Sequence, residues 1–184
     1  TGGPSVPFER LVDMLRPGDV ATHSFRGGSF ILDNSGRVHD RVREAQSRGV
    51  VFDIGHGGGS FAFDTARKAL DQDFKPSTIS SDLHIGNVEG PVFDLVTTLS
   101  KFLHLGLSLD EVIERSTHVP AKILGVPDEL GTLKVGARGD ITLLRLDEGR
   151  FKLTDAPRES VEARQRLSHV VTFRAGRRYR QWME

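Results

Sequence analysis

The sequence lacks several features that would assign it to a class at once. It has no cysteine among 184 residues, which excludes disulfides and thiolate metal ligands and leaves histidine and carboxylate as the metal ligands. Its 25 basic and 25 acidic residues cancel, so the charge signature of a nucleic-acid-binding protein is missing. No apolar run could cross a bilayer, and the first residues show no signal-peptide pattern. These absences predict a cytoplasmic protein with no membrane or nucleic-acid partner.

The residues that are present are typical of a folded domain. Hydrophobic residues make up 37% of the chain and charged residues 27%, which argues against disorder. A chain of this length can bury roughly 70% of the surface that its unfolded form exposes.

Short apolar segments alternate with amphipathic stretches over the first two-thirds of the chain. We predict strands at residues 19–23, 50–54 and 78–82, the first two of them buried, and each is followed by a loop and a helical pattern. Ser60 is expected to cap the helix that runs through Leu70, and the spacing of Ser108 and Glu111 predicts a capping box at the start of a later short helix. Strand followed by helix, three times over, predicts an α/β fold with a parallel sheet.

The pattern changes after about residue 125. Glycines there separate short strands predicted at 141–146, 151–153 and 170–174, which indicates a small β-rich region. We therefore predict two parts, residues 1–125 and residues 126–184.

A polar side chain stands at or just after the end of each predicted parallel strand: His23, His56 and Asp82. The carboxyl ends of parallel strands share one face, so these side chains can converge. Two imidazoles and a carboxylate suit Zn²⁺ or a similar divalent ion. The alternative is that each is an ordinary polar residue at a strand end.

The glycine-rich turn at residues 55–60 supports a second interpretation. Such a turn between strand and helix can hold a phosphate on backbone N–H groups, and Asp82 would then resemble the acidic ribose ligand of a dinucleotide fold. Two details count against it. Ser60 stands where the third glycine belongs, and His56 places a ring in the turn that should contact the pyrophosphate.

Several segments together resemble one family, the amidohydrolase superfamily, and within it the amidohydrolase/deacetylase branch that is often called dihydroorotase-like. The segments are 15–23 (LRPGDVATH), 52–57 (FDIGHG), 78–84 (TISSDLH), 90–95 (GPVFDL), 100–103 (SKFL) and 131–140 (GTLKVGARGD). Gly139 stands where the family usually has alanine.

The resemblance implies a fold and a site. The fold would be the C-terminal part of a (β/α)₈ TIM-type barrel with a small β-sandwich segment. His23 and Asp82 would be metal ligands, and Asp82 would also be the catalytic base and acid. His56, His84, Arg26 and Gly27 would bind the substrate, an N-acyl or cyclic amide whose C–N bond is hydrolysed with the help of one or two divalent ions, most simply Zn²⁺.

The sequence also departs from the family. It has no His-x-His motif and no lysine in a strand that could bridge two metals, and another family histidine would precede Thr1. A closed barrel needs about 250 residues. We therefore expect the C-terminal half of such an enzyme, inactive alone, as a homo-oligomer or with a missing N-terminal half. A nucleotide-binding module and a non-catalytic half-domain that needs a partner chain remain the alternatives.

Overall fold

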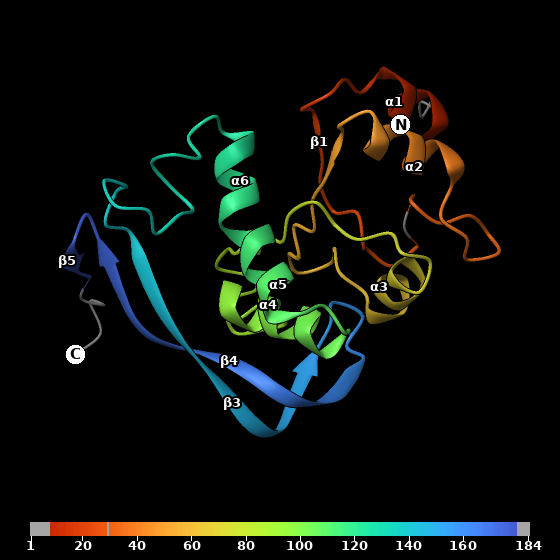
Figure 1. Cartoon of the computed structure of the whole chain (residues 1–184). Coiled ribbons are helices and arrows are strands. Elements are labelled where there is room, and N and C mark those ends of the chain that lie inside the picture. Colours follow the sequence, from red (N-terminus) through yellow and green to blue (C-terminus); the bar gives the residue numbers. More distant parts are fainter. Residues whose placement is uncertain (1–7, 29, 180–184) are drawn as a thin grey trace.

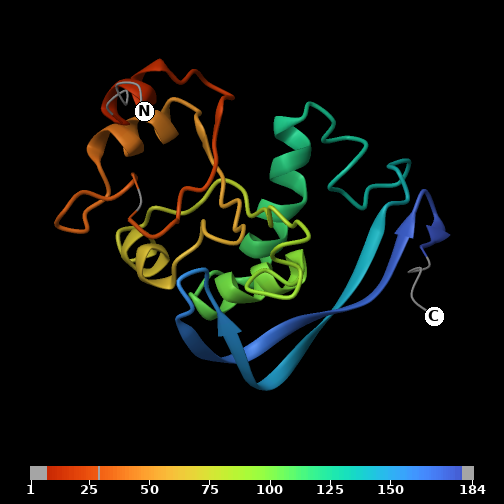
Figure 2. The same cartoon turned by 180° about the vertical axis from the view of Figure 1, so that it is seen from behind.

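The computed structural model describes residues 8–28 and 30–179, and it follows the predicted alternation of strands and helices. In chain order the elements are α1 (Phe8–Met14), β1 (Val20–Ala21), α2 (Asp40–Ser47), β2 (Val51–Phe52), α3 (Phe63–Leu70), α4 (Leu95–His104), α5 (Leu109–Ser116), α6 (His118–Ile123), β3 (Ile141–Thr154), β4 (Ser160–Arg174) and β5 (Arg177–Arg178). Figures 1 and 2 show, from opposite sides, a long hairpin of β3 and β4 running across α4, with α1 and β5 far apart. The structure does not describe residues 1–7, which would follow the family histidine that the resemblance places before Thr1.

The small parallel sheet carries the predicted strand ends. Strand β1 pairs in parallel with β2, and an isolated parallel bridge between Asp53 and Thr78 adds the third predicted strand. Further backbone bonds extend that pairing, from His56 N to Ser80 O at 3.2 Å. Strand β2 is buried as expected, but Val20 in β1 is 51% exposed, so the prediction of a buried strand there is wrong. Among the described residues β1 pairs only with β2, which leaves its other edge open.

Aromatic side chains fill the space beneath these strand ends. The rings of Phe25, Phe52, Phe61, Phe74 and Phe102 are fully buried, and neighbouring rings have centroids 5.4 to 6.4 Å apart. Each buried ring contributes roughly 1.5–3 kcal/mol relative to an exposed one. This core fixes the backbone from which the polar strand ends project.

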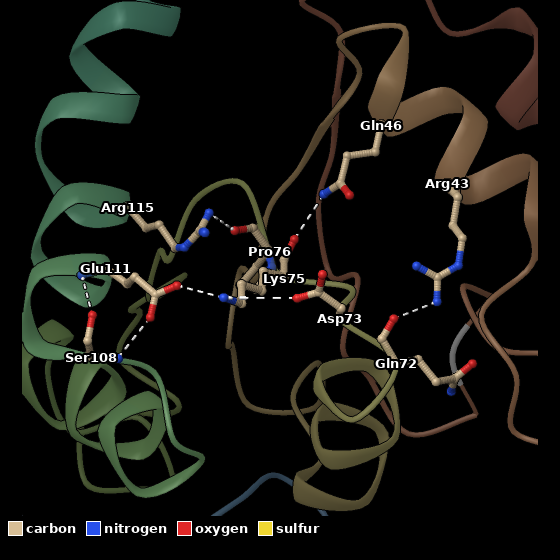
Figure 3. A network of polar contacts seen from close by, with 9 residues as sticks. All are labelled: Arg43, Gln46, Gln72, Asp73, Lys75, Pro76, Ser108, Glu111 and Arg115. Carbon is tan, nitrogen blue, oxygen red and sulfur yellow. Dashed lines mark hydrogen bonds and ion pairs between the residues drawn. The ribbon is translucent and has the colours of Figure 1, made fainter.

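The turn that leads into the third strand is held from two sides (Figure 3). From α2, Arg43 and Gln46 donate to carbonyls of the 72–76 turn at 2.8 and 2.9 Å. From α5, Arg115 donates to a carbonyl of the same turn at 2.6 Å, and Glu111 accepts from the turn's lysine at 2.8 Å. The start of the segment that leads to Asp82 is therefore tied to two helices.

The helix starts confirm one prediction and correct another. The capping box of α5 is complete, with Ser108 and Glu111 each accepting from the other's backbone N–H. Ser60, however, does not cap α3, which begins at Phe63 after Ala62. The carboxylate of Asp155, from the β3–β4 turn, accepts a hydrogen bond from Phe63 N at 2.9 Å instead. A group distant in the sequence thus performs the local cap.

The C-terminal strands are longer than predicted, since 141–154 and 160–174 form one antiparallel hairpin. In β4 the buried residues Ala163 and Leu167 are separated by exposed polar ones, which is why the sequence pattern there was missed. The hairpin joins α4 through a hydrogen bond from Leu167 N to Ser100 Oγ at 3.0 Å. Close packing explains the glycine at position 139, because a Cβ there would lie 2.8 Å from Gly176 N.

The hairpin and the helical part share one core. Leu153, Ala163 and Leu167 belong to the same buried cluster as Phe52 and Phe102. A boundary at residue 125 stays a prediction, and the described residues form two separate sheets without a closed barrel. No described helix is long and apolar enough to cross a membrane.

Candidate active site

His23 follows β1 and turns its ring onto the loop after β2. Its Nδ1 lies 2.7 Å from the carbonyl oxygen of Gly55. A carbonyl only accepts, so Nδ1 carries the proton and Nε2 is left with a free lone pair. This is the arrangement by which proteins orient a metal-binding imidazole. A Cβ on Gly55 would lie 2.7 Å from the same Nδ1, so only glycine allows this approach.

Asp82 reaches the same loop from the other side. A Cβ on Gly57 would lie 2.6 Å from Asp82 Oδ2, so the carboxylate rests directly against the glycine backbone. Asn87, fully buried, donates to the backbone carbonyl of Asp82 at 2.9 Å and holds the turn. Within the part of the chain that the structure describes, the carboxylate oxygens of Asp82 accept no hydrogen bond, and the residue is exposed.

His23 and Asp82 therefore flank one short turn, residues 55–57. Both also have left-handed backbone, with φ of 62° and 45°. This conformation costs a side-chain-bearing residue roughly 1–2 kcal/mol, although histidine and aspartate adopt it more often than most. Strained residues that lie together at the carboxyl ends of the strands, here called the rim, are a reason to suspect function there.

Asp53 organises this rim, although no sequence motif singled it out. It is 8% exposed and accepts three hydrogen bonds, from the hydroxyls of Thr22 (2.8 Å), Thr78 (2.6 Å) and Ser80 (2.7 Å). These hydroxyls lie on the two flanking strand segments. A carboxylate inside an apolar strand, with hydroxyl residues at the neighbouring strand ends, was the available signal.

The resemblance implies that His56 binds the substrate, but the structure buries its ring completely. The ring stacks on Phe61 at 4.8 Å, and its Nδ1 lies 2.9 Å from Gly57 O. Its Nε2 lies 2.7 Å from Lys101 Nζ. Burial, aided by the positive charge of Lys101, lowers the pKa of His56 to about 4, so the ring is neutral.

Lys101 is also fully buried and was missed as a polar partner for this region. Its Nζ donates to Pro91 O at 2.8 Å as well as to His56. Burial lowers its pKa to about 7, against the charges of Asp155 and Asp94, which raise it. A lysine in the apolar stripe of a predicted helix was the sequence signal that could have revealed it.

The remaining predicted substrate residues lie in exposed loops. His84 is exposed, two residues beyond Asp82, and its Nδ1 accepts from Gly86 N at 3.1 Å. Arg26 and Gly27 are both exposed. The backbone carbonyl of Arg26 accepts a hydrogen bond from Thr65 Oγ1 on α3 at 3.1 Å. These residues lie in the loops that follow β1 and the third predicted strand.

The turn at 55–60 does not form the phosphate site of the nucleotide interpretation. Helix α3 starts three residues beyond Ser60, and its Phe63 N–H is bound to the carboxylate of Asp155, which is 1% exposed. A phosphate would have to displace a buried carboxylate from this helix end.

The described residues supply part of the ligand set that a divalent ion needs. His23 offers a free Nε2 and Asp82 free carboxylate oxygens, which are ligands that Zn²⁺ accepts. The described residues contain no group of three or more histidine, cysteine or acidic side chains that could hold a metal. Further ligands would have to come from outside them.

Comparison with known proteins finds relatives that match most of this chain. Curated deacetylases of Brucella anthropi and Enterococcus faecalis are 37% and 36% identical over 157 and 175 residues, which cover 84% and 94% of this chain but 39% and 47% of theirs. The solved structure of an adenine deaminase aligns with a TM-score of 0.90 at 35% identity, over 97% of this chain and 50% of that one. A dihydroorotase aligns with a TM-score of 0.83 at 32% identity, over 97% and 46%.

The chain thus spans about half the length, or less, of the relatives it matches. Residues 62–177, which run from the residue before α3 into β5, match the amidohydrolase family. The family resemblance that the sequence motifs carry is confirmed, and the partial coverage of the relatives fits the expectation of a C-terminal part. The chain belongs to the amidohydrolase family.

Proposed function

We propose that this chain forms the C-terminal part of the active site of a metal-dependent amidohydrolase that hydrolyses the C–N bond of an N-acyl or cyclic amide. The observation that carries the proposal is the convergence of His23 and Asp82 on the 55–57 turn, each against a glycine that has no room for a side chain. The deacetylases and the deaminase among its relatives support C–N bond chemistry.

His23 would hold a divalent ion through Nε2, since its Nδ1 is bound to Gly55 O. Asp82 would be the second ligand from this chain. When bound, such an ion supplies a water of lowered pKa and polarises the scissile carbonyl. Zn²⁺ is the simplest choice for imidazole and carboxylate ligands, in one or two copies.

Asp82 would carry the proton. Its exposed carboxylate would take a proton from the attacking water and return it to the nitrogen of the leaving amine, first as general base and then as general acid. The Arg26 guanidinium suits a substrate carboxylate, and His84 a second polar contact. His56, being buried, would act on the substrate only through the turn that it supports.

The test uses the complete gene product that contains this chain, assayed with Zn²⁺ on a panel of N-acyl amino acids and cyclic amides. Asp82→Asn should lower kcat about 100- to 10,000-fold while the thermal unfolding transition stays in place. Glu89→Gln is the matched control, because Glu89 is an exposed carboxylate on the same loop, and it should retain parental activity. Parental turnover in Asp82→Asn would overturn the assignment.

A second candidate, a half-domain that associates with a partner chain, is favoured by exposed apolar side chains in β1 and α1. Val20 in β1 and Leu11 and Met14 in α1 are 51%, 48% and 67% exposed. Parallel strands are normally covered on both faces and paired at both edges. Light scattering of this chain, alone and mixed with the N-terminal part of a related deacetylase, tests this: a stable complex supports it, and a persistent monomer in both samples contradicts it.

A further inference from the structure

The buried ammonium group of Lys101 has partners that the proposed chemistry does not use. It lies on α4 with no exposed surface, and no carboxylate among the described residues forms an ion pair with it. Its two polar contacts are His56 Nε2 at 2.7 Å and Pro91 O at 2.8 Å. Burying a lysine is costly, so a lysine held in this way calls for a reason beyond packing.

One of these contacts leads to Asp82 through the glycine turn. Gly57 O only accepts, so His56 Nδ1 carries the proton and His56 Nε2 accepts from Lys101. Gly57 in turn donates its N–H to Ser81 O at 3.0 Å, and its Cα lies against the Asp82 carboxylate. Lys101 thereby fixes the surface on which that carboxylate rests.

The other contact leads to Asp82 along the chain. Pro91 closes the loop that begins at Asp82, and Asn87 in this loop donates to Asp82 O at 2.9 Å. Asn87 Oδ1 also accepts from His84 N at 2.9 Å. The loop is therefore tied at both ends, to the backbone of Asp82 and to the side chain of Lys101.

We propose that Lys101 is a positioning residue that sets the place of the Asp82 carboxylate, by holding the 55–57 turn through His56 and the 82–91 loop through Pro91. The proposal rests on the proposed function of Asp82. Its structural half, the support of two loops by one buried lysine, can be tested without any activity.

The experiment measures amide hydrogen exchange of this chain and kinetics of the complete gene product. Lys101→Met keeps the length of the side chain and removes both hydrogen bonds. Exchange at the amides of His56, Gly57 and Asn87 should rise about tenfold or more, because charge-assisted bonds are lost. The amide of Ala66 in α3, bound to Ala62 O, should not change.

Two further variants separate positioning from loss of stability. Ser100→Ala removes a buried α4 hydroxyl that bonds the hairpin but touches neither loop, so it should leave exchange in both loops at the parental rate. His56→Phe keeps the stack on Phe61 and removes both ring nitrogens, so exchange should rise at Gly57 but not at Asn87. If Lys101→Met does not fold, this loop-selective response of His56→Phe decides the question.

Kinetics complete the test. Lys101→Met should lower kcat about 100-fold with KM within a factor of about two, since a displacement of the catalytic group by about 1 Å has this effect. Unchanged exchange in both loops overturns the proposal. Increased exchange with parental kcat overturns it as well. If Asp82→Asn is fully active while Lys101→Met still loosens both loops, the proposed function of Asp82 fails and the support of the loops stands.

Discussion

Removing the Asp53 carboxylate tests how the candidate site is built. Asp53 is 8% exposed and accepts hydroxyl hydrogen bonds from Thr22, Thr78 and Ser80 at 2.6 to 2.8 Å. A hydrogen bond to a charged group contributes about 1.5 kcal/mol or more. The variant Asp53→Ala no longer has to bury a carboxylate, which offsets part of the loss. We expect a net loss of about 3–4 kcal/mol, a large fraction of the 5–15 kcal/mol that is ordinary for a folded domain.

The assay is urea unfolding of the chain, followed by circular dichroism. With a slope of about 2 kcal/mol/M, the loss predicts a midpoint lowered by roughly 1.5–2 M with the slope unchanged. Thr78→Val keeps the side-chain shape and removes one donor, so it should cost about 1 kcal/mol.

Asp33→Ala is the matched control for this experiment. Asp33 also accepts three hydrogen bonds, from Ser35 N, Ser35 Oγ and Arg37 N, but in a surface loop. Water replaces those bonds, so its loss should be far smaller. If Asp53→Ala destabilises the chain no more than Asp33→Ala does, Asp53 does not hold the strand ends together and our account of the rim is wrong.

Three other outcomes follow from the same geometry. Gly57→Ala should lower kcat sharply in the complete gene product, because its φ is 51° and the new Cβ would lie 2.6 Å from Asp82 Oδ2, whereas Gly59→Ala has nothing within 4 Å and should be silent. Calorimetric titration of the chain alone with Zn²⁺ should show weak binding, since His23 and Asp82 are only two ligands; tight one-to-one binding would show that the chain holds a complete site. The folded pKa of Lys101, about 7, lies below its ordinary 10.5, so the unfolded chain binds more protons between these values and stability should rise with pH across that window. Lys101→Met should lack this rise, and an identical pH dependence in both proteins would refute the lowered pKa.

The sequence predicted the strand ends but not the groups that hold them together. Parallel strands at β1, β2 and Thr78 followed from apolar runs bounded by glycine and polar residues, and the α5 capping box followed from its spacing. Local patterns of this kind depend on residues close in the chain, so they can be recognised without a structure. The family motifs could be recognised for the same reason, because each is a short run of neighbouring residues.

The sequence by itself determined which polar residues stand at the carboxyl ends of the strands, because alternation and turn residues mark where a strand stops. Only the tertiary structure decided that Asp155 caps α3 from 92 residues away, that Asp53 joins three strand ends, and that the ring of His56 points into the core onto Lys101. Each of these depends on hydrogen bonds and burial between residues that are distant in the chain. A buried polar group takes whichever partner the packing brings within about 3 Å, and a linear pattern carries no record of that distance.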